Sequence, residues 1–269
     1  MNNAFNNRLL LMLFVGACLL YGAATWIDSY KSKSKYKTVI TSVDSSLISK
    51  LEIISKKADR EPIILERTTD SWIGRQGSIE SFVDHASINS VLDQIDQITV
   101  KRVASVSSDR WSDFEVSDSV ANVVRAYIGE KRVIDLLVGN FNFQQQPQSV
   151  TTFVREPGDE VVYGIEGLLS MNIDRNFQSY RNRSFINLNA ENITSVRLNL
   201  LEGQQILQKE SLGWTLDGSA IDSVEVKNYL SALSTQRGNF FADGFEGDRP
   251  FSTISIRGNQ MNEILVSAY

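Results

Sequence analysis

Two stretches of the chain repeat the same order of sequence patterns, and this internal repeat limits the folds that the chain can adopt. The first copy contains, in order, apolar segments at residues 48–53 and 64–67, Trp72, Asp84, and an apolar-periodic run at residues 88–95. The second copy contains, in the same order, segments at residues 193–198 and 206–209, Trp214, Asp222, and a run at residues 226–233. Matched elements separated by loops of unequal length indicate a duplicated scaffold.

Alternating apolar residues predict a hairpin at residues 47–55 and 62–67, followed by a short strand that begins at Trp72. A helix is predicted next, because the following apolar residues have the spacing of one buried helix face. These residues are Ile88, Val91, Leu92, Ile95 and Ile98. Asp84 is predicted to cap this helix, and Asp222, with Glu225 three residues on, is predicted to cap its counterpart.

Further hairpins complete each copy. The first copy continues with strands at residues 123–128 and 132–138, which match residues 252–257 and 264–266 of the second. Two more strands are predicted between the copies, at residues 150–155 and 161–165. We therefore expect an α+β fold with two related units, at residues 44–188 and 189–269, each an antiparallel β-meander packed against one helix.

The N-terminus is strongly apolar. Residues 9–27 carry no charge over 19 positions, long enough for a single transmembrane helix in an anchor at residues 1–30. Two alternatives remain open: cleavage of a signal peptide near Gly22, and lipidation at Cys18 after Val15-Gly16-Ala17. A lysine-rich linker occupies residues 31–43, and its charges favour a cytoplasmic location by the positive-inside rule. An uncleaved N-terminal anchor more commonly exports the rest of the chain, so we favour the exported side of the membrane.

The composition excludes some classes of function. A net charge of −5 and a pI near 5.1 argue against nucleic-acid binding, which usually requires a basic surface. Cys18 is the only cysteine, so no disulfide can form within the chain and no cysteine-based zinc site is available.

Few residues suggest chemistry. His85 is the only histidine, and its counterpart in the second copy is Ser223, so we interpret it as an exposed residue of the first helical turn. The acidic stretch Asp109, Asp113, Glu115 and Asp118 lacks the spacing of an EF-hand and is interpreted as a solvated loop. No phosphate-binding glycine loop or nucleophile elbow occurs. We therefore predict no enzymatic activity, no cofactor, and no catalytic, cofactor-binding or metal-binding residues.

Trp72 and Trp214 occupy equivalent places in the two copies. This equivalence favours core positions, because tryptophan is mostly buried. The alternative is that one of them is exposed and stacks against a sugar or peptide.

The order of these patterns resembles a bacterial family of domains of unknown function that are often encoded beside ABC transporters of the gliding-motility (Gld) type. The resemblance rests on packing positions spread over nearly the whole chain after the apolar segment. They are Trp72, residues 88–95, Phe114, Leu137-Val138-Gly139, Phe153-Val154, Val162-Tyr163, Trp214, Leu230, Leu233 and residues 245–250. The pattern departs at Pro250, whose rough counterpart is Ser119. The resemblance implies a membrane-tethered accessory component of an ABC-type export or envelope system, at the periplasmic side of a bacterial inner membrane.

The sequence supports three hypotheses of function. The first is a membrane-anchored, non-enzymatic accessory component of an ABC-type transporter or envelope complex that binds the permease or auxiliary subunits. The second is an envelope module that binds peptidoglycan or polysaccharide through an exposed tryptophan. The third is a hydrolase that uses His85 and the acidic stretch. A partner strand is also expected to pair with the edge near residues 264–266.

Overall fold

The computed structural model describes residues 12, 14–23, 25, 36–146 and 148–269. The chain forms two compact units, Met1–Tyr180 and Arg181–Tyr269, each with its own apolar core. The second unit begins at Arg181, ahead of the start that the sequence suggested at residue 189, because strand β11 (Ser184–Asn187) pairs with β16 (Thr235–Arg237) of the same unit.

The N-terminal prediction requires correction. Residues 12, 14–23 and 25 are helical and mostly exposed, and the rest of the predicted anchor lies outside the described residues. Within the described part of the chain, no helix has both the length and the apolar character needed to cross a membrane. The predicted linker is also partly structured, since β1 (Val39–Ser42) pairs with the later strand β6 (Gln97–Ser105).

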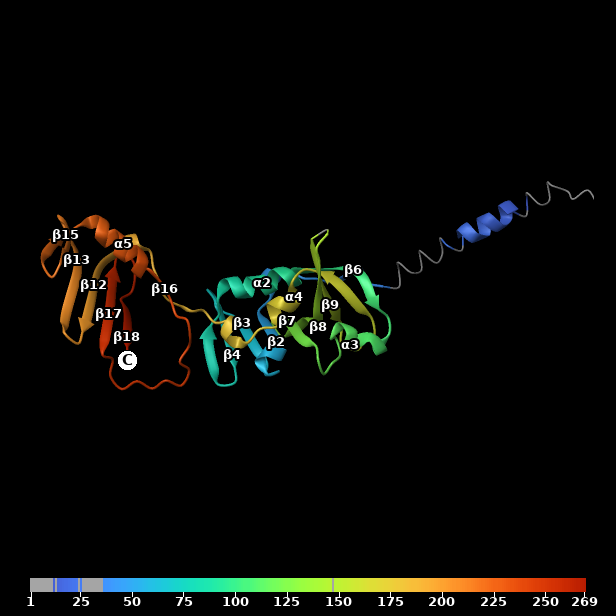
Figure 1. Cartoon of the computed structure of the whole chain (residues 1–269), viewed down its shortest axis with the longest axis horizontal. Helices are drawn as coiled ribbons and strands as arrows, with labels where there is room; N and C mark the ends of the chain where they lie inside the picture. The colour runs from blue at the N-terminus through green and yellow to red at the C-terminus, as the bar shows by residue number, and fades with distance from the viewer. Residues whose placement is uncertain (1–11, 13, 24, 26–35, 147) are drawn as a thin grey trace, which may run out of the picture. The chain divides into compact units, whose positions relative to one another are not determined.

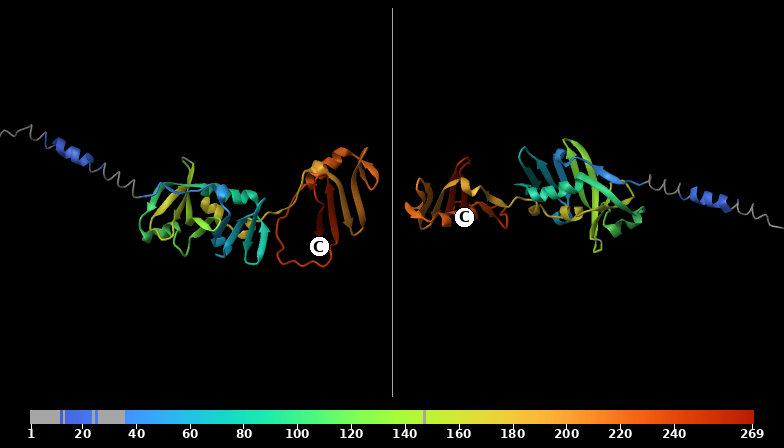
Figure 2. Two further views of the ribbon diagram at one scale, coloured as in Figure 1. Left: turned by 180° about the vertical axis from the view of Figure 1, so that it is seen from behind. Right: turned by 90° about the horizontal axis from the view of Figure 1, so that it is seen from above.

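The first unit is built on one large antiparallel sheet, whose ten strands follow the order β1-β6-β10-β9-β8-β7-β2-β3-β4-β5 (Figure 1). The eight strands not yet introduced are β2 (Lys50–Ile54), β3 (Ile63–Arg67), β4 (Trp72–Gln76), β5 (Ile79–Phe82), β7 (Asn122–Ile128), β8 (Lys131–Gln144), β9 (Ser149–Arg155) and β10 (Val162–Glu166). The hairpin of β8 and β9 extends beyond the other strands of this unit in all three views (Figures 1 and 2).

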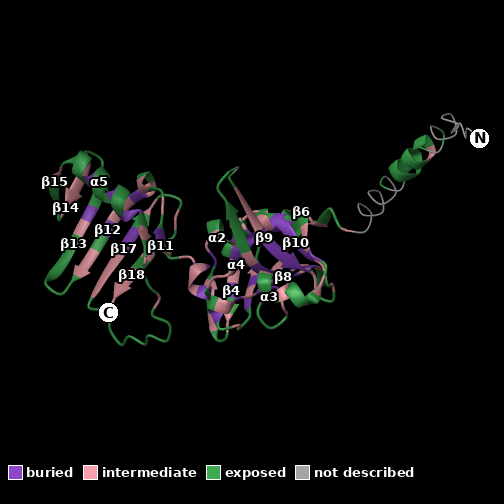
Figure 3. Ribbon diagram, turned by 45° about the vertical axis from the view of Figure 1, so that its right-hand side comes forward, coloured by how far each residue is buried: buried purple, intermediate pink, exposed green. Residues whose placement is uncertain are grey.

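The core of the first unit lies between this sheet and two helices. Helix α2 (His85–Asp96) buries the predicted face of Ile88, Val91, Leu92 and Ile95. Ile98 is also buried, but it lies in β6 because the helix ends at Asp96. Helix α4 (Leu169–Ile173) adds a second packed segment that the sequence analysis missed. Figure 3 shows how the buried residues gather in the middle of the sheet.

Short helical turns occupy the connections of both units. They are η1 (Ser45–Leu47), η2 (Lys56–Ala58), η3 (Ser108–Arg110), α3 (Trp111–Phe114), η4 (Phe177–Ser179) and η5 (Ala190–Asn192).

The second unit contains a six-stranded antiparallel sheet in the order β15-β14-β13-β12-β17-β18 and one helix, α5 (Ser223–Leu233). The strands are β12 (Ile193–Leu200), β13 (Gly203–Glu210), β14 (Gly213–Leu216), β15 (Ser219–Ile221), β17 (Ser252–Gly258) and β18 (Ile264–Ala268). The first unit contains six neighbouring strands with the same connectivity, in the order β5-β4-β3-β2-β7-β8. The first sheet then continues through β9, β10, β6 and β1, whereas β18 is an edge strand.

The predicted α+β fold class was wrong: the described chain is mostly antiparallel β-sheet, with three sheets and only short helices. The share of strand was underestimated, because several strands are short or polar. Strand β6, for example, carries Lys101 and Arg102 and was not predicted, and β8 continues to Gln144 through polar residues. The first unit is also not a meander with one helix, because β6 crosses to the far side of the sheet and α4 packs beside α2.

Candidate functional site

Helix α5 lies across one face of the second sheet and covers only part of it. The cross-strand register places Val196, Leu207 and Ile256 side by side on this face, and all three are buried. Val226, Leu230 and Leu233 of α5 belong to the same core cluster. Figure 1 shows that the strands continue past the helix, so part of the apolar face has no cover from α5.

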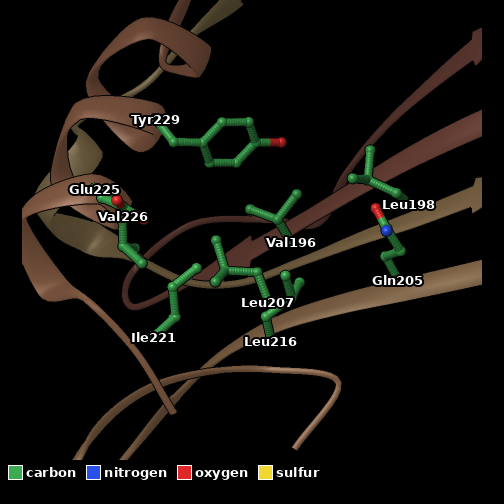
Figure 4. A pocket seen from close by; sticks show the side chains of 9 residues that line it. All are labelled: Val196, Leu198, Gln205, Leu207, Leu216, Ile221, Glu225, Val226 and Tyr229. Carbon is green, nitrogen blue, oxygen red and sulfur yellow. The ribbon is translucent and has the colours of Figure 1, made fainter. Parts of the chain in front are cut away.

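An apolar pocket opens on one side of α5, where the strands extend beyond it. Its volume is about 300 Å³. Its walls are aliphatic side chains from β12, β13, β14, the end of β15 and α5, and polar groups stand at the rim (Figure 4). The aliphatic residues are Val196, Leu198, Leu207, Leu216, Ile221 and Val226, and the polar ones are Gln205, Glu225 and Tyr229.

The rim of this pocket carries one acidic group and no basic one. Glu225 is exposed in the first turn of α5, and Tyr229 is 40% exposed one turn later. Burial of the phenol raises the pKa of Tyr229 above its ordinary value, so the hydroxyl stays neutral at physiological pH. The pocket can therefore receive an apolar group and offer neutral and acidic hydrogen-bonding partners around it.

The apolar face continues away from the pocket along the same strands. Leu198 and its cross-strand partner Ile254 are half-buried, as is Val266, the partner of Ile254 on β18. Leu200, two residues beyond Leu198, is 46% exposed. Side chains two residues apart share one face of a strand, so these positions form a continuous apolar surface next to the pocket.

A second, more polar cleft of about 740 Å³ lies on the opposite side of α5. Trp214 and its cross-strand partner Lys209 form part of its wall, and Lys227 reaches it from the helix. The remaining lining residues come from the η5 turn and the adjacent strand, and from α5. They are Asn189, Ala190, Glu191, Ile193, Ser223, Leu230 and Ser231.

The structure separates the residues that the sequence analysis weighed for chemistry. His85 is exposed at the start of α2, next to its cap Asp84, which accepts a hydrogen bond from the Ser87 backbone N–H at 3.0 Å. Within the described residues, no group of three or more histidine, cysteine or carboxylate side chains is arranged to hold a metal ion.

The acidic stretch faces basic side chains and not a shared cation site. Asp113 pairs with Arg110 at 3.0 Å and Glu115 pairs with Lys56. Asp118 accepts from the Arg155 guanidinium at 2.8 Å. Three of the four carboxylates are thus engaged in ion pairs.

The two equivalent tryptophans differ in exposure. Trp72 is 4% exposed, and the Arg67 guanidinium stacks 4.7 Å from the centre of its ring. Trp214 packs against the second core but is only half-buried, since it also lines the polar cleft. The predicted core position is therefore correct for Trp72 and only partly correct for Trp214.

A family model described as Domain of unknown function (DUF4340) matches residues 78–244. The chain belongs to this family. In this DUF4340 protein the matched region begins before β5 and includes α2, α5 and the pocket-lining strands β12, β13 and β14. Neither the curated proteins nor the solved structures contain a significant match to the chain.

The pocket was not predicted from the sequence, although the sequence of β12 contains one signal for it. Val196, Leu198 and Leu200 alternate on one face of β12, and their exposure rises along the strand from buried Val196 to Leu200, which is 46% exposed. Tyr229 belongs to the predicted helix face, yet it stands at the rim of the pocket and not in the core.

Proposed function

We propose that this protein is a non-enzymatic accessory component that binds a protein partner through the apolar pocket beside α5. The observation that carries the proposal is the incomplete cover of the second sheet, which leaves a pocket of about 300 Å³ lined by six aliphatic residues. Exposed apolar surface of this kind is costly in water and is typical of interaction sites.

The lining defines the chemistry of the partner. An aliphatic or aromatic side chain fits the pocket, because its walls are aliphatic and its volume matches a small anchor group. Glu225 and Tyr229 at the rim favour a basic or amide group beside that anchor, since they offer a carboxylate and a neutral hydroxyl.

For the identity of the partner, we propose the permease or an auxiliary subunit of an ABC-type transporter or envelope complex. The support is the resemblance of the sequence to domains encoded beside gliding-motility (Gld) type transporters. Under this proposal the protein works at the periplasmic side of the bacterial inner membrane. The partner contributes the apolar anchor, and this protein contributes the receiving pocket.

The test is a pull-down of the full-length protein from detergent-solubilised bacterial envelopes, followed by mass spectrometry. Two variants address the pocket: Leu198→Glu places a charge in its wall, and Tyr229→Lys places a positive charge at its rim, beside the basic or amide group expected of the partner. Gln208→Glu is the matched control, because Gln208 is exposed on the opposite face of the same sheet.

The proposal expects a transporter subunit in fixed ratio with the wild type and with Gln208→Glu, and an at least tenfold lower yield with both pocket variants. Burying an unpaired charge in an apolar interface costs several kcal/mol, which is more than this loss requires. Circular dichroism checks that each variant is folded. Recovery of the same subunit with folded pocket variants, or of no transporter subunit with the wild type, would refute the proposal.

A further inference from the structure

The polar cleft on the other side of α5 has the features of a second binding site. It combines an aromatic side chain, two amines and several hydroxyl or amide groups in one concave surface of about 740 Å³. Sites for small ligands usually occupy roughly 300–1,000 Å³ and combine an apolar wall with a few polar groups. The apolar wall is formed by Trp214 together with Leu230 and Ile193.

The charges of this cleft are available for a ligand. Lys209 and Lys227 are both exposed, and neither forms an ion pair with any residue that the structure describes. Glu191 is the only carboxylate in the lining, so the cleft carries an excess of positive charge in a protein whose net charge is −5. An anionic ligand is favoured there.

The indole N–H of Trp214 is available to donate a hydrogen bond to a ligand. This N–H donates to no atom within the described chain, whereas the indole N–H of Trp111 donates to the Glu160 carbonyl oxygen at 3.0 Å. One part of the Trp214 ring packs against the core and another part lines the cleft. An aromatic face attracts the partly positive C–H groups of a sugar ring, for the same electrostatic reason that aromatic edges meet aromatic faces.

The backbone around the cleft argues against an added peptide strand. Trp214 and Lys209 lie on β14 and β13, and each of these strands has a hydrogen-bonded neighbour on both sides. An extended peptide needs free backbone groups at a sheet edge, and none is offered by these two strands. Recognition at this place depends on side chains, which suits a ligand rich in hydroxyl groups.

We propose that this cleft binds an acidic saccharide. Its carboxylates pair with Lys209 and Lys227, one sugar ring packs against Trp214, and its hydroxyls bond with Asn189, Ser223 and Ser231. This site goes beyond the pocket proposed for the protein partner, because the two lie on opposite sides of α5 and share none of their lining residues.

The test is isothermal titration calorimetry of the full-length protein with three tetramers. Tetragalacturonate is the acidic saccharide, maltotetraose is its neutral match, and tetraglutamate is an acidic peptide. Lys209→Gln and Lys227→Gln each remove one cleft charge, and Trp214→Phe keeps an aromatic ring for the core. Lys131→Gln is the control for charge, since Lys131 is exposed at the β7–β8 turn of the first unit.

We expect tetragalacturonate to bind, and each cleft lysine variant to weaken it about fivefold at low salt, as for an exposed ion pair. Trp214→Phe should weaken it further, while Lys131→Gln should have no effect. Added salt should lower the affinity, because the lysines are exposed. Absence of tetragalacturonate binding, equal binding of maltotetraose or tetraglutamate, or binding unchanged in the cleft variants would overturn the proposal.

Discussion

Arg155 provides the sharpest test of how the first unit is held together. Its side chain is 1% exposed at the end of β9. The guanidinium donates to the backbone carbonyl oxygens of Val116 and Asp159, each at 3.0 Å, and to that of Glu156 at 3.5 Å. It also stacks 3.7 Å from the centre of the Trp111 ring and pairs with Asp118. Loops that are distant in sequence are thus tied to one buried cation.

The contacts of Arg155 are expected to contribute unequally to the free energy of unfolding. Hydrogen bonds from a charged group contribute about 1.5–3 kcal/mol each, so the two backbone bonds at 3.0 Å are worth roughly 3–6 kcal/mol. Asp118 is 72% exposed, and an ion pair with so exposed a partner contributes at most about 1 kcal/mol. We therefore expect Arg155→Met to destabilise the first unit by about 3–5 kcal/mol, after some relief from desolvation of the charge, and Asp118→Asn by less than about 1 kcal/mol.

Hydrogen exchange measured by mass spectrometry during a urea titration is a suitable assay, because it reports β9 and β13 separately and so distinguishes the two units. Exchange in β13 of the second unit is the internal control and should not change. If Asp118→Asn costs as much as Arg155→Met, the surface ion pair and not the carbonyl bonds holds these loops, and the reasoning is wrong.

Three further predictions concern stability. Burial raises the pKa of the Tyr180 phenol well above 10, so as the pH rises the unfolded chain loses this proton before the folded chain does. The first unit should therefore lose stability above about pH 10. Tyr180→Phe should reduce that loss in urea titrations repeated at several pH values. A Cβ added at Gly139 would lie 1.9 Å from the Phe114 carbonyl oxygen, so Gly139→Ala should cost about 3 kcal/mol or more by urea titration. Asp222 caps α5 by accepting from the Val224 N–H, so Asp222→Ala should cost about 1 kcal/mol, measured by exchange in α5.

The sequence predicted local elements better than their assembly. The faces of α2 and the caps Asp84 and Asp222 follow from spacing and residue type alone, and they are present as predicted. Strands β7 and β8 were also predicted from local patterns, because their apolar residues alternate and Gly129 lies in the turn between them.

The assembly depends on contacts that no local pattern records. Strand β6 is held by β1 on one side and β10 on the other, although its sequence is partly polar. The half-exposure of Trp214 was equally hidden, because it depends on where α5 crosses the sheet and not on the residues beside Trp214. The fold class was wrong for the same reason: strands such as β1 and β6 form by pairing between distant segments, and no local pattern marks them.

The shared strand order has a consequence for the synthesis of the chain. In each unit the central strand, β2 or β12, pairs with one neighbour that comes directly after it and with another that arrives only after the helix. During translation the nascent chain therefore presents a half-paired strand until β7 or β17 has left the ribosome. Such non-local pairing slows folding and leaves an edge open to wrong partners. A chaperone that protects β2 until residue 128 has emerged should therefore raise the yield of folded protein.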